Sequence, residues 1–381
     1  MREIYLDNSA TTRPLPEVVE AMVQTLTDNY GNPSSLHNKG LKAEKILKAA
    51  RRKIAEKLAV SPEEIIFTSG GTESNNLAIK GIAYQYQNRG RHLVTTEVEH
   101  PSVLESFLAL EEEGFEVTFL EADRYGRISL DDLRDSITPE TILASIIHVN
   151  NELGTIHPLA EIGTIIKEKN PNTFFHTDCI QSFGKMLVQP ARSMVDLLSI
   201  SGHKIHGPKG IGVLYKRKGI ELRALQTGGG QENGYRCGTE NIPGIAGLIP
   251  ALDALPDYTE ENPYNQELDR LKNHFIRGLE KIDRKVIINS PEDGAPHILN
   301  ISFPGIKGEV LIHSLEAEGV YVSTGSACHS KSREKSHVLR AIGLPMEQID
   351  GTIRVSFSTY NTIEELDYAL ASLAKQLKTF F

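Results

Sequence analysis

Short β-rich runs alternate with helical patterns between about residue 60 and residue 216 of this chain. The runs are Glu64–Thr68, His92–Thr96, Glu116–Leu120, Thr141–Val149, Thr173–Asp178, Leu197–Ser201 and Gly212–Lys216, and helical patterns at Glu73–Tyr86, Ser102–Glu113 and Leu159–Lys169 lie between several of them. This alternation is typical of a mostly parallel sheet that helices cover on both faces. The sequence therefore predicts an α/β fold built on a mostly parallel sheet of these seven strands.

The length of 381 residues favours two domains, because single hydrophobic cores seldom grow this large. We expect residues 15–255 to form a large α/β domain, with a surface helix at Leu41–Leu58 packed on the sheet. Residues 256–381, joined by residues 1–14, are expected to form a smaller α+β domain. Its predicted elements are helices at Asn265–Ile282, Gly308–Glu318 and from Ile363, and strands near Val286, Ile298, Val320 and Ile353–Phe357.

The charge and the apolar pattern exclude several classes of protein. Net charge is −9 with a pI near 5.8, and no Lys/Arg block is long enough for direct binding of nucleic acid or a membrane surface. The sequence contains no apolar run of about 18 residues and no signal peptide, so we expect a cytoplasmic protein. The three cysteines, Cys179, Cys237 and Cys328, have neither disulfide nor zinc spacing, and no metal site is expected.

A lysine stands where the run Leu197–Ser201 ends. Ser201-Gly202-His203-Lys204 leads into a glycine-rich stretch, which lets backbone approach a ligand closely. A lone loop lysine is usually just solvated. Beside a hydroxyl and an imidazole, however, Lys204 also suits a Schiff base to an aldehyde cofactor.

Three further segments follow strand ends. Ser69–Asn76, with Gly71 and Thr72, opens a helix and offers backbone N–H groups for a phosphate; its alternative is an ordinary capped turn. Asp178 is placed to pair with a pyridine nitrogen, although a helix cap is its simpler reading. His100 is placed to stack on a flat ring, although alone it would more often be structural. Together with Lys204 these segments predict a site for pyridoxal 5'-phosphate.

Nine strings in this sequence carry a resemblance to a known family. They are YLDNSATT, GNPSSLH, FTSGGTESNN, HVNNELGT, HTDCIQSFGK, SGHKIHGPKGIG, GGGQENGYRCGTEN, GSACHS and VLRAIGL, which run in this order from residue 5 to residue 344. The chain resembles the cysteine desulfurases of the class V aminotransferase group. The resemblance implies a fold type I homodimer, dependent on pyridoxal phosphate, that converts L-cysteine to L-alanine and keeps the sulfur as a persulfide.

The resemblance also implies roles for individual residues. Lys204 would form the Schiff base, His100 would stack on the cofactor ring and Asp178 would pair with its nitrogen. The remaining cofactor contacts would come from Gly71, Thr72, Ser201, Gly202 and His203 at the phosphate, Thr239 from the other subunit, and Asn151 and Gln181 at the ring hydroxyl. Arg354 would clamp the substrate carboxylate, with Asn151 beside it, although a surface salt bridge is the alternative for this arginine.

Cys328 separates sulfur transfer from the other chemistries of this fold. It lies in a polar, cationic, glycine-containing stretch, Ser323–Lys335, which suits a reactive and accessible thiolate. We expect Cys179 to be a small residue of the hydrophobic core, and we assign no catalytic role to Cys237. We expect Cys328 to take the sulfur and pass it to an acceptor protein, either an iron-sulfur scaffold or a tRNA-thiolation sulfurtransferase.

Other functions remain open at this point. An aminotransferase or another lyase of the same fold would share Lys204, Asp178 and the phosphate site, and selenocysteine lyase activity differs by one chalcogen atom. A sulfur-relay or scaffold protein with a decayed cofactor site is the alternative from another class. It predicts a colourless purified protein.

Overall fold

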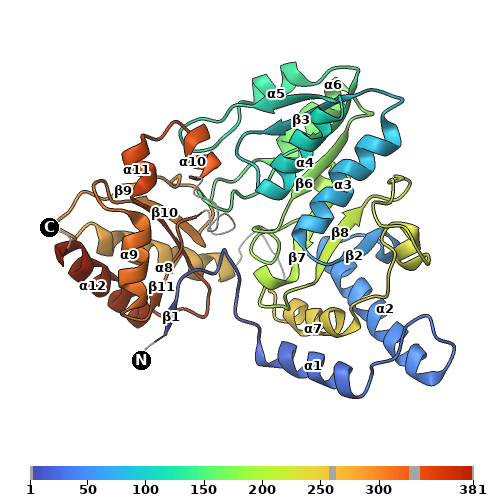
Figure 1. Cartoon of the computed structure of the whole chain (residues 1–381), viewed down its shortest axis with the longest axis horizontal. Coiled ribbons are helices and arrows are strands. Elements are labelled where there is room, and N and C mark those ends of the chain that lie inside the picture. Colours follow the sequence, from blue (N-terminus) through green and yellow to red (C-terminus); the bar gives the residue numbers. More distant parts are fainter. Residues whose placement is uncertain (1–2, 257–262, 326–334, 380–381) are drawn as a thin grey trace.

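The computed structural model describes residues 3–256, 263–325 and 335–379 (Figure 1). Its strands are β1 (Ile4–Tyr5), β2 (Ile65–Thr68), β3 (His92–Thr96), β4 (Glu116–Leu120), β5 (Thr141–Ser145), β6 (Phe174–Asp178), β7 (Leu197–Ser201), β8 (Gly212–Lys216), β9 (Ile287–Ile288), β10 (Ile298–Ser302), β11 (Val320–Tyr321) and β12 (Thr352–Ser356). Its α-helices are α1 (Pro16–Thr27), α2 (Asn38–Leu58), α3 (Gly71–Tyr86), α4 (Pro101–Glu112), α5 (Leu130–Ser136), α6 (Leu159–Lys169), α7 (Ile242–Asp253), α8 (Pro263–Leu279), α9 (Gly308–Glu316), α10 (His337–Ala341), α11 (Met346–Asp350) and α12 (Ile363–Thr379).

The predicted mostly parallel sheet is confirmed. Its seven strands lie in the order β2-β8-β7-β6-β5-β3-β4. Strand β8 pairs antiparallel with both of its neighbours, while β7, β6, β5, β3 and β4 pair in parallel. Strands β2, β3, β5, β6 and β7 therefore all end at the same edge of the sheet.

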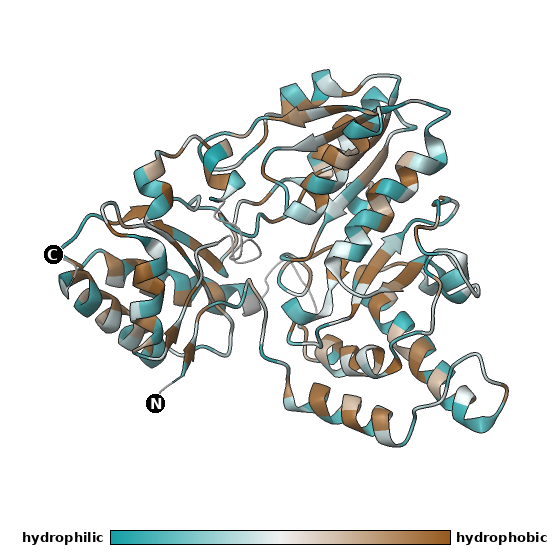
Figure 2. Ribbon diagram, in the orientation of Figure 1, coloured by the Kyte–Doolittle hydropathy of each residue, from teal (hydrophilic) through white to brown (hydrophobic). Residues whose placement is uncertain are grey.

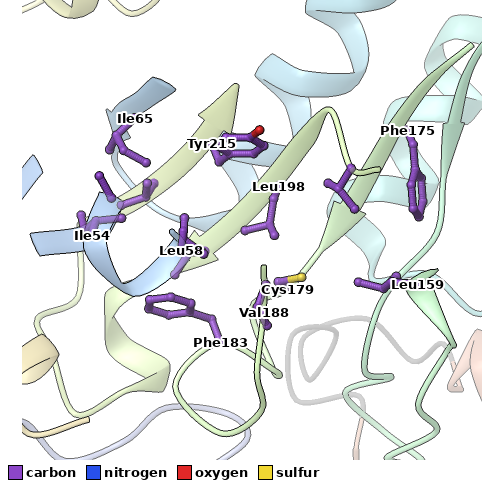
Figure 3. Packing of buried hydrophobic residues seen from close by; sticks show 14 of the residues in the cluster. Ile54, Leu58, Ile65, Leu159, Phe175, Cys179, Phe183, Val188, Leu198 and Tyr215 are labelled. Atoms are coloured by element: carbon purple, nitrogen blue, oxygen red, sulfur yellow. The ribbon is translucent and has the colours of Figure 1, made fainter. Parts of the chain in front are cut away.

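Apolar side chains cover both faces of this sheet, because successive residues of a strand point to opposite faces. On β7, Leu198 joins one core and Leu197 the other. Helices α2, α6 and α7 contribute to the first core, in which the buried Cys179 packs as expected (Figure 3). Helices α3 and α4 cover the other face.

A second, smaller core forms around two short sheets. Strands β12, β10 and β9 form one sheet, β1 and β11 pair in parallel, and α8, α9 and α12 supply the remaining buried side chains. Ile4 and Leu6 from the start of the chain belong to this core. The dark blue N-terminal segment thus lies beside the red C-terminal elements in Figure 1 before it leads to α1. The expected domain boundary after residue 255 stays a prediction.

Two predicted elements are shorter than expected. The strand predicted over Thr141–Val149 ends at Ser145. Beyond it, Asn150 accepts the N–H groups of Glu152 and Leu153 and folds the chain into a turn. The helix predicted over Gly308–Glu318 ends at Glu316, close to Gly319, whose φ of 79° is left-handed and stops a helix.

Helices α1 and α7 and several short elements were not predicted. Helix α7 contains Pro250 and two glycines, Gly244 and Gly247. It lacks an amphipathic pattern, because it packs against both α1 and α2 and is buried along most of its length. The predicted surface helix at Leu41–Leu58 is α2, and it packs on α7 as well as on β2.

Candidate active site

The strand ends at one edge of the large sheet bring the predicted site residues together. Gly71 follows β2, His100 follows β3, Asn151 follows β5, Asp178 ends β6 and Lys204 follows β7. The carboxyl ends of neighbouring parallel strands meet at one edge, which is the usual place for a ligand in such sheets. The positions of these side chains thus follow from the strand order.

These residues line a cleft of about 330 Å³. The lining residues are Ser9, Ala10, Gly71, Thr72, His100, Ile147, Asn151, Asp178, Ile180, Gln181, Ser201, His203, Lys204, Gly325 and Arg354. Arg354 comes from β12 of the smaller sheet, so the cleft lies between the two parts of the molecule. Its size and its mixed lining suit a small flat ligand.

Among the described residues, two of the predicted site residues do not line the cleft. Gly202 is buried beside it, where an added Cβ would lie 2.9 Å from Ile211 Cγ2. Thr239 is exposed and does not line the cleft, and its expected contact with the cofactor of another subunit stays a prediction. Cys328 lies outside the described residues.

Lys204 is held at the cleft by the N-terminal segment. Its Nζ donates to the carbonyl of Ala10 at 2.9 Å and also contacts the carbonyl of Ser9. The buried Lys185 donates to the backbone carbonyl of Lys204 at 3.0 Å. Burial and the charge of Lys204 lower the pKa of Lys185 to about 7. The amine of Lys204 therefore points into the cleft from a fixed backbone.

Asp178 is buried, and both of its carboxyl oxygens accept hydrogen bonds. Ile180 N–H donates to Oδ1 at 2.9 Å and Asn75 Nδ2 donates to Oδ2 at 2.8 Å. Burial raises the pKa of Asp178, while these hydrogen bonds and the charge of Lys204 act in the opposite direction. Such a carboxyl group is well placed to hold a cationic ring nitrogen.

His100 and His203 border the cleft with defined hydrogen bonds. His100 Nδ1 accepts a hydrogen bond from Ser102 N at 3.1 Å and so caps helix α4. His100 therefore has a structural role, the N-cap, as well as a position at the cleft. His203 Nδ1 lies 3.1 Å from Thr11 Oγ1. Burial, with nearby lysine charges, lowers the pKa of His203 to about 3, so this imidazole is neutral at neutral pH.

Several buried polar atoms of the cleft have no hydrogen-bond partner among the described residues. They are Ser9 Oγ, Asn151 Oδ1, Gln181 Oε1, Ser201 Oγ and Arg354 Nε. Native proteins rarely leave such atoms unpaired, because each costs on the order of 1–3 kcal/mol. A polar ligand in the cleft would satisfy them.

Arg354 is 2 % exposed and its guanidinium is fixed at the cleft. Nη1 donates to the carbonyls of Asn151 and Gly325, and Nη2 pairs with Asp7 Oδ1 at 3.0 Å. The surface salt bridge considered for this residue is therefore excluded. Nε has no partner in the part of the chain that the structure describes, so it could donate to an anion.

Some residues of the site were not predicted. Asp7, Ser9 and Ala10 contact Arg354 or Lys204, and Asn75 contacts Asp178. All four lie in the strings YLDNSATT and FTSGGTESNN. These motifs marked the segments as part of the site, but they did not indicate which side chains would contact one another. Gly325 also lines the cleft, two positions after the β12 partner Ser323.

The chain matches the family model Aminotransferase class-V over residues 4–369. It is 45 % identical over 381 residues to a protein of Clostridium botulinum named cysteine desulfurase IscS, covering 99 % of this chain and 95 % of that protein. It is 46 % identical over 369 residues to a cysteine desulfurase IscS of Methanosarcina thermophila, covering 97 % and 90 % respectively.

Two solved structures are also similar to this chain in both fold and sequence. A NifS-like protein, 38 % identical, superposes with a TM-score of 0.92 and covers 99 % of this chain and 100 % of that one. A structure described as SspA in complex with cysteine, also 38 % identical, gives a TM-score of 0.82 and covers 94 % and 99 %.

The fold and the site thus define a fold type I enzyme, and the chain belongs to the aminotransferase class-V family. Within this family it is a member of the cysteine desulfurases. The resemblance drawn from its motifs is confirmed.

Proposed function

We propose that this chain removes sulfur from L-cysteine, releases L-alanine and holds the sulfur as a persulfide on Cys328. The observation that carries the proposal is the cleft itself, in which Lys204 and Asp178 lie among polar atoms that lack partners. The cysteine desulfurase family, to which the chain belongs, depends on pyridoxal 5'-phosphate. The donor set fits that cofactor, because the cleft offers an amine, a buried carboxyl group and a helix N-terminus for a phosphate.

The residues of the cleft divide between the parts of the cofactor. Thr72 and the start of α3 at Gly71, with Ser201, His203 and the backbone at Gly202, would hold the phosphate. Asp178 would hold the ring nitrogen, His100 would stack on the ring, and the unpartnered oxygens of Asn151 and Gln181 would face its hydroxyl. Pyridoxal phosphate, when bound through Lys204, withdraws electrons from the α-carbon of an amino acid.

Arg354 and Asn151 would bind the substrate. A planar guanidinium binds a carboxylate through two parallel hydrogen bonds, and Arg354 Nε has no acceptor among the residues that the structure describes. A cysteine bound in this way would lie in the same cleft as the amine of Lys204. Once its amine is free, Lys204 would take the α-proton as general base.

Cys328 would then accept the sulfur. Its thiolate attacks the substrate sulfur, a sulfur–sulfur bond forms, and the substrate's carbon–sulfur bond breaks with its electron pair left on carbon. The β-carbon would take up the proton that Cys328 lost on becoming a thiolate, Lys204 would return the α-proton to the α-carbon, and alanine would leave. The persulfide would pass its terminal sulfur to an acceptor protein, an iron-sulfur scaffold or a tRNA-thiolation sulfurtransferase.

An exposed apolar stripe on α1 supports a homodimer. Val19, Val23 and Leu26 lie on one face of α1 and are 51 %, 53 % and 61 % exposed. The ribbon of α1 carries several hydrophobic stretches, drawn in brown in Figure 2. Contiguous exposed apolar surface usually marks an interface. A second copy that covers α1 would bury this stripe, and Thr239 would then serve the partner's phosphate rather than the cleft of its own chain.

The location in the cell stays a prediction. Among the described residues, no helix is both long enough and apolar enough to cross a bilayer. We propose a cytoplasmic enzyme.

The proposal is tested by measuring alanine and sulfide released from L-cysteine with dithiothreitol. The purified protein should be yellow and active, and Lys204→Ala should lose activity while the exposed control Lys218→Ala keeps it. An aminotransferase would form a keto acid instead of alanine. A colourless protein without activity would support the decayed scaffold and contradict the proposal.

A further inference from the structure

A second lysine amine is buried against the backbone of Lys204. Lys185 lies in the loop that follows β6, and only 5 % of the residue is exposed. Its Nζ donates to the backbone carbonyl of Lys204 at 3.0 Å, although Lys185 is not among the residues that line the cleft. Lysine is almost never buried to this extent without a specific reason, because removing its amine from water costs free energy. The position of Lys185 beside Lys204 supplies such a reason.

The loop after β6 is shaped so that it reaches Lys204. Gly184 has a left-handed φ of 81°, and a Cβ added there would collide with Ile205 Cγ2. A glycine therefore lets this loop pack closely against the residue that follows Lys204. The N–H of Lys185 donates to the carbonyl of Ser182 at 3.0 Å, which fixes the turn that carries the amine.

The same loop also supports the group that the amine of Lys204 contacts. Gln181 Nε2 donates to the carbonyl of Ser9 at 2.9 Å. This carbonyl is one of two that accept from Lys204 Nζ, the other being that of Ala10. The loop after β6 thus holds Lys204 at its backbone and at the far end of its side chain.

Charges of both signs act on the nitrogen of Lys204. Burial raises the pKa of Asp7 and of Asp178, and the charge of Lys204 opposes this shift, so both carboxylates favour a positive charge on Lys204. Lys185 acts in the opposite direction. Burial and the charge of Lys204 lower the pKa of Lys185 to about 7, and repulsion between two cations is reciprocal.

Three histidines surround this pair of lysines. Burial, together with the charge of Lys185, lowers the pKa of His203, His206 and His297, so these imidazoles are neutral at neutral pH. Neither ring nitrogen of the buried His297 has a hydrogen-bond partner among the described residues. The histidines therefore add no charge that would replace the effect of Lys185 on Lys204.

The other cations near the cleft are offset in different ways. Arg354 lines the cleft, but it forms an ion pair with Asp7. Lys209, whose charge also acts on His203, is exposed, so solvent and salt screen it. His100 borders the cleft as the N-cap of α4. Lys185 differs from these groups because it is a buried amine in direct contact with the backbone of Lys204.

We propose that Lys185 is a positioning residue for Lys204, which fixes its backbone through a hydrogen bond and disfavours a positive charge on its nitrogen. A lysine must be neutral to act as a nucleophile or a general base, and a neighbouring cation is one way to keep it so. The inference rests on the proposed function, because it assumes that Lys204 forms the Schiff base with the cofactor.

The test is a spectrophotometric pH titration of the Schiff-base absorbance in the holoenzyme. Lys185→Met removes the amine, and Lys185→Gln keeps a hydrogen-bond donor without the charge. Because each variant loses a repelling cation, we expect the midpoint of the titration to move upward by about half a pH unit or more in both. Lys185→Arg keeps the charge and should leave the midpoint close to that of the wild type.

Lys216→Met is the matched control. Lys216 is 6 % exposed, and its Nζ donates to the carbonyl of Ile220 at 2.7 Å, so it is also a buried lysine bonded to the backbone. It ends β8 opposite Leu197, the first residue of β7, whereas Lys204 follows the last. Lys216 therefore lies at the other edge of the sheet, and its replacement should not move the midpoint.

An unchanged midpoint in Lys185→Met and Lys185→Gln would overturn the inference. An equal shift in Lys216→Met would do so too, because the loss of any buried lysine would then have this effect. A wild-type Schiff base that keeps its proton up to about pH 10 would also contradict it, since Lys185 would not be opposing the charge. If Lys185→Met does not fold, the difference between Lys185→Gln and Lys185→Arg decides.

Borohydride reduction followed by peptide mapping separates this inference from the proposed function. Cofactor attached to a residue other than Lys204 would contradict the proposed function and the inference with it. Cofactor attached to Lys204, with the same midpoint in the wild type, Lys185→Met and Lys185→Gln, would contradict the inference alone.

Discussion

Arg354 on β12 forms an ion pair with Asp7 near the start of the chain, with 3.0 Å between Nη2 and Oδ1. The pair joins two ends of the sequence that the small sheet brings together, because Asp7 also bridges to Ser356. Residues just after Asp7 contact Lys204. One N-terminal segment therefore supports both the proposed carboxylate-binding group and the proposed Schiff-base lysine.

Replacing Arg354 by lysine should weaken substrate binding. We expect Arg354→Lys to raise KM for L-cysteine by tenfold or more with a smaller change in kcat, because an ammonium group cannot offer two parallel donors. Steady-state kinetics measure this, with Arg277→Lys on the exposed side of α8 as the control. An unchanged KM would contradict the role of Arg354.

Asp178→Asn should leave the cofactor bound and impair turnover. An amide cannot stabilise a protonated ring nitrogen as a carboxylate does, so we expect kcat to fall by at least a hundredfold. The measurement is kcat together with the visible absorbance of the bound cofactor. If kcat stays within a few-fold of the wild type, Asp178 does not hold the ring nitrogen.

Acid should destabilise the protein through buried histidines. Burial lowers the pKa of His148 and of His157 to about 4, below the value of about 6.5 in the unfolded chain. The unfolded state therefore binds protons first as the pH falls. Stability is greatest above about pH 6.5 and declines toward about pH 4, by up to about 1.4 kcal/mol per pH unit for each histidine.

Urea unfolding between pH 7.5 and 4.5 tests this expectation. His148→Gln should make the pH dependence shallower, whereas His313→Gln on the exposed side of α9 should leave it unchanged. Equal slopes in the wild type and His148→Gln would show that His148 does not contribute.

The apolar stripe on α1 predicts the oligomeric state. Val23→Asp with Leu26→Asp should produce monomers in sedimentation experiments, because two charges replace the exposed apolar face. Activity should fall as well, since Thr239 would no longer reach the partner's cleft. Val310→Asp, at an exposed apolar position on α9, serves as the control, and a monomeric wild-type enzyme with full activity would refute the dimer.

The sequence allowed prediction of the large sheet and of most residues that line the cleft. The strands are short apolar runs with clear ends, and their parallel order places those ends together. Asp178 and Lys204 could be found because both stand where such a run ends. The local pattern of apolar runs was sufficient to identify site residues at strand ends, because the fold brings the ends of neighbouring strands together at one edge of the sheet.

Contacts between distant segments could not be predicted in this way. The pairing of Asp7 with Arg354, and of Asn75 with Asp178, depends on how loops and the small sheet pack against the large one. Helix α7 was missed for a related reason, since it is buried between two helices and carries no amphipathic signal. Tertiary packing decides these features, and a single sequence does not display it.

The central claim is that Cys328 accepts sulfur from cysteine, and mass spectrometry of the alkylated Cys328 peptide tests it most directly. After one turnover without reductant, we predict that this peptide carries one additional sulfur atom and that the peptides of Cys179 and Cys237 do not. A Cys328 peptide without additional sulfur, from an enzyme that has released alanine, would contradict the account.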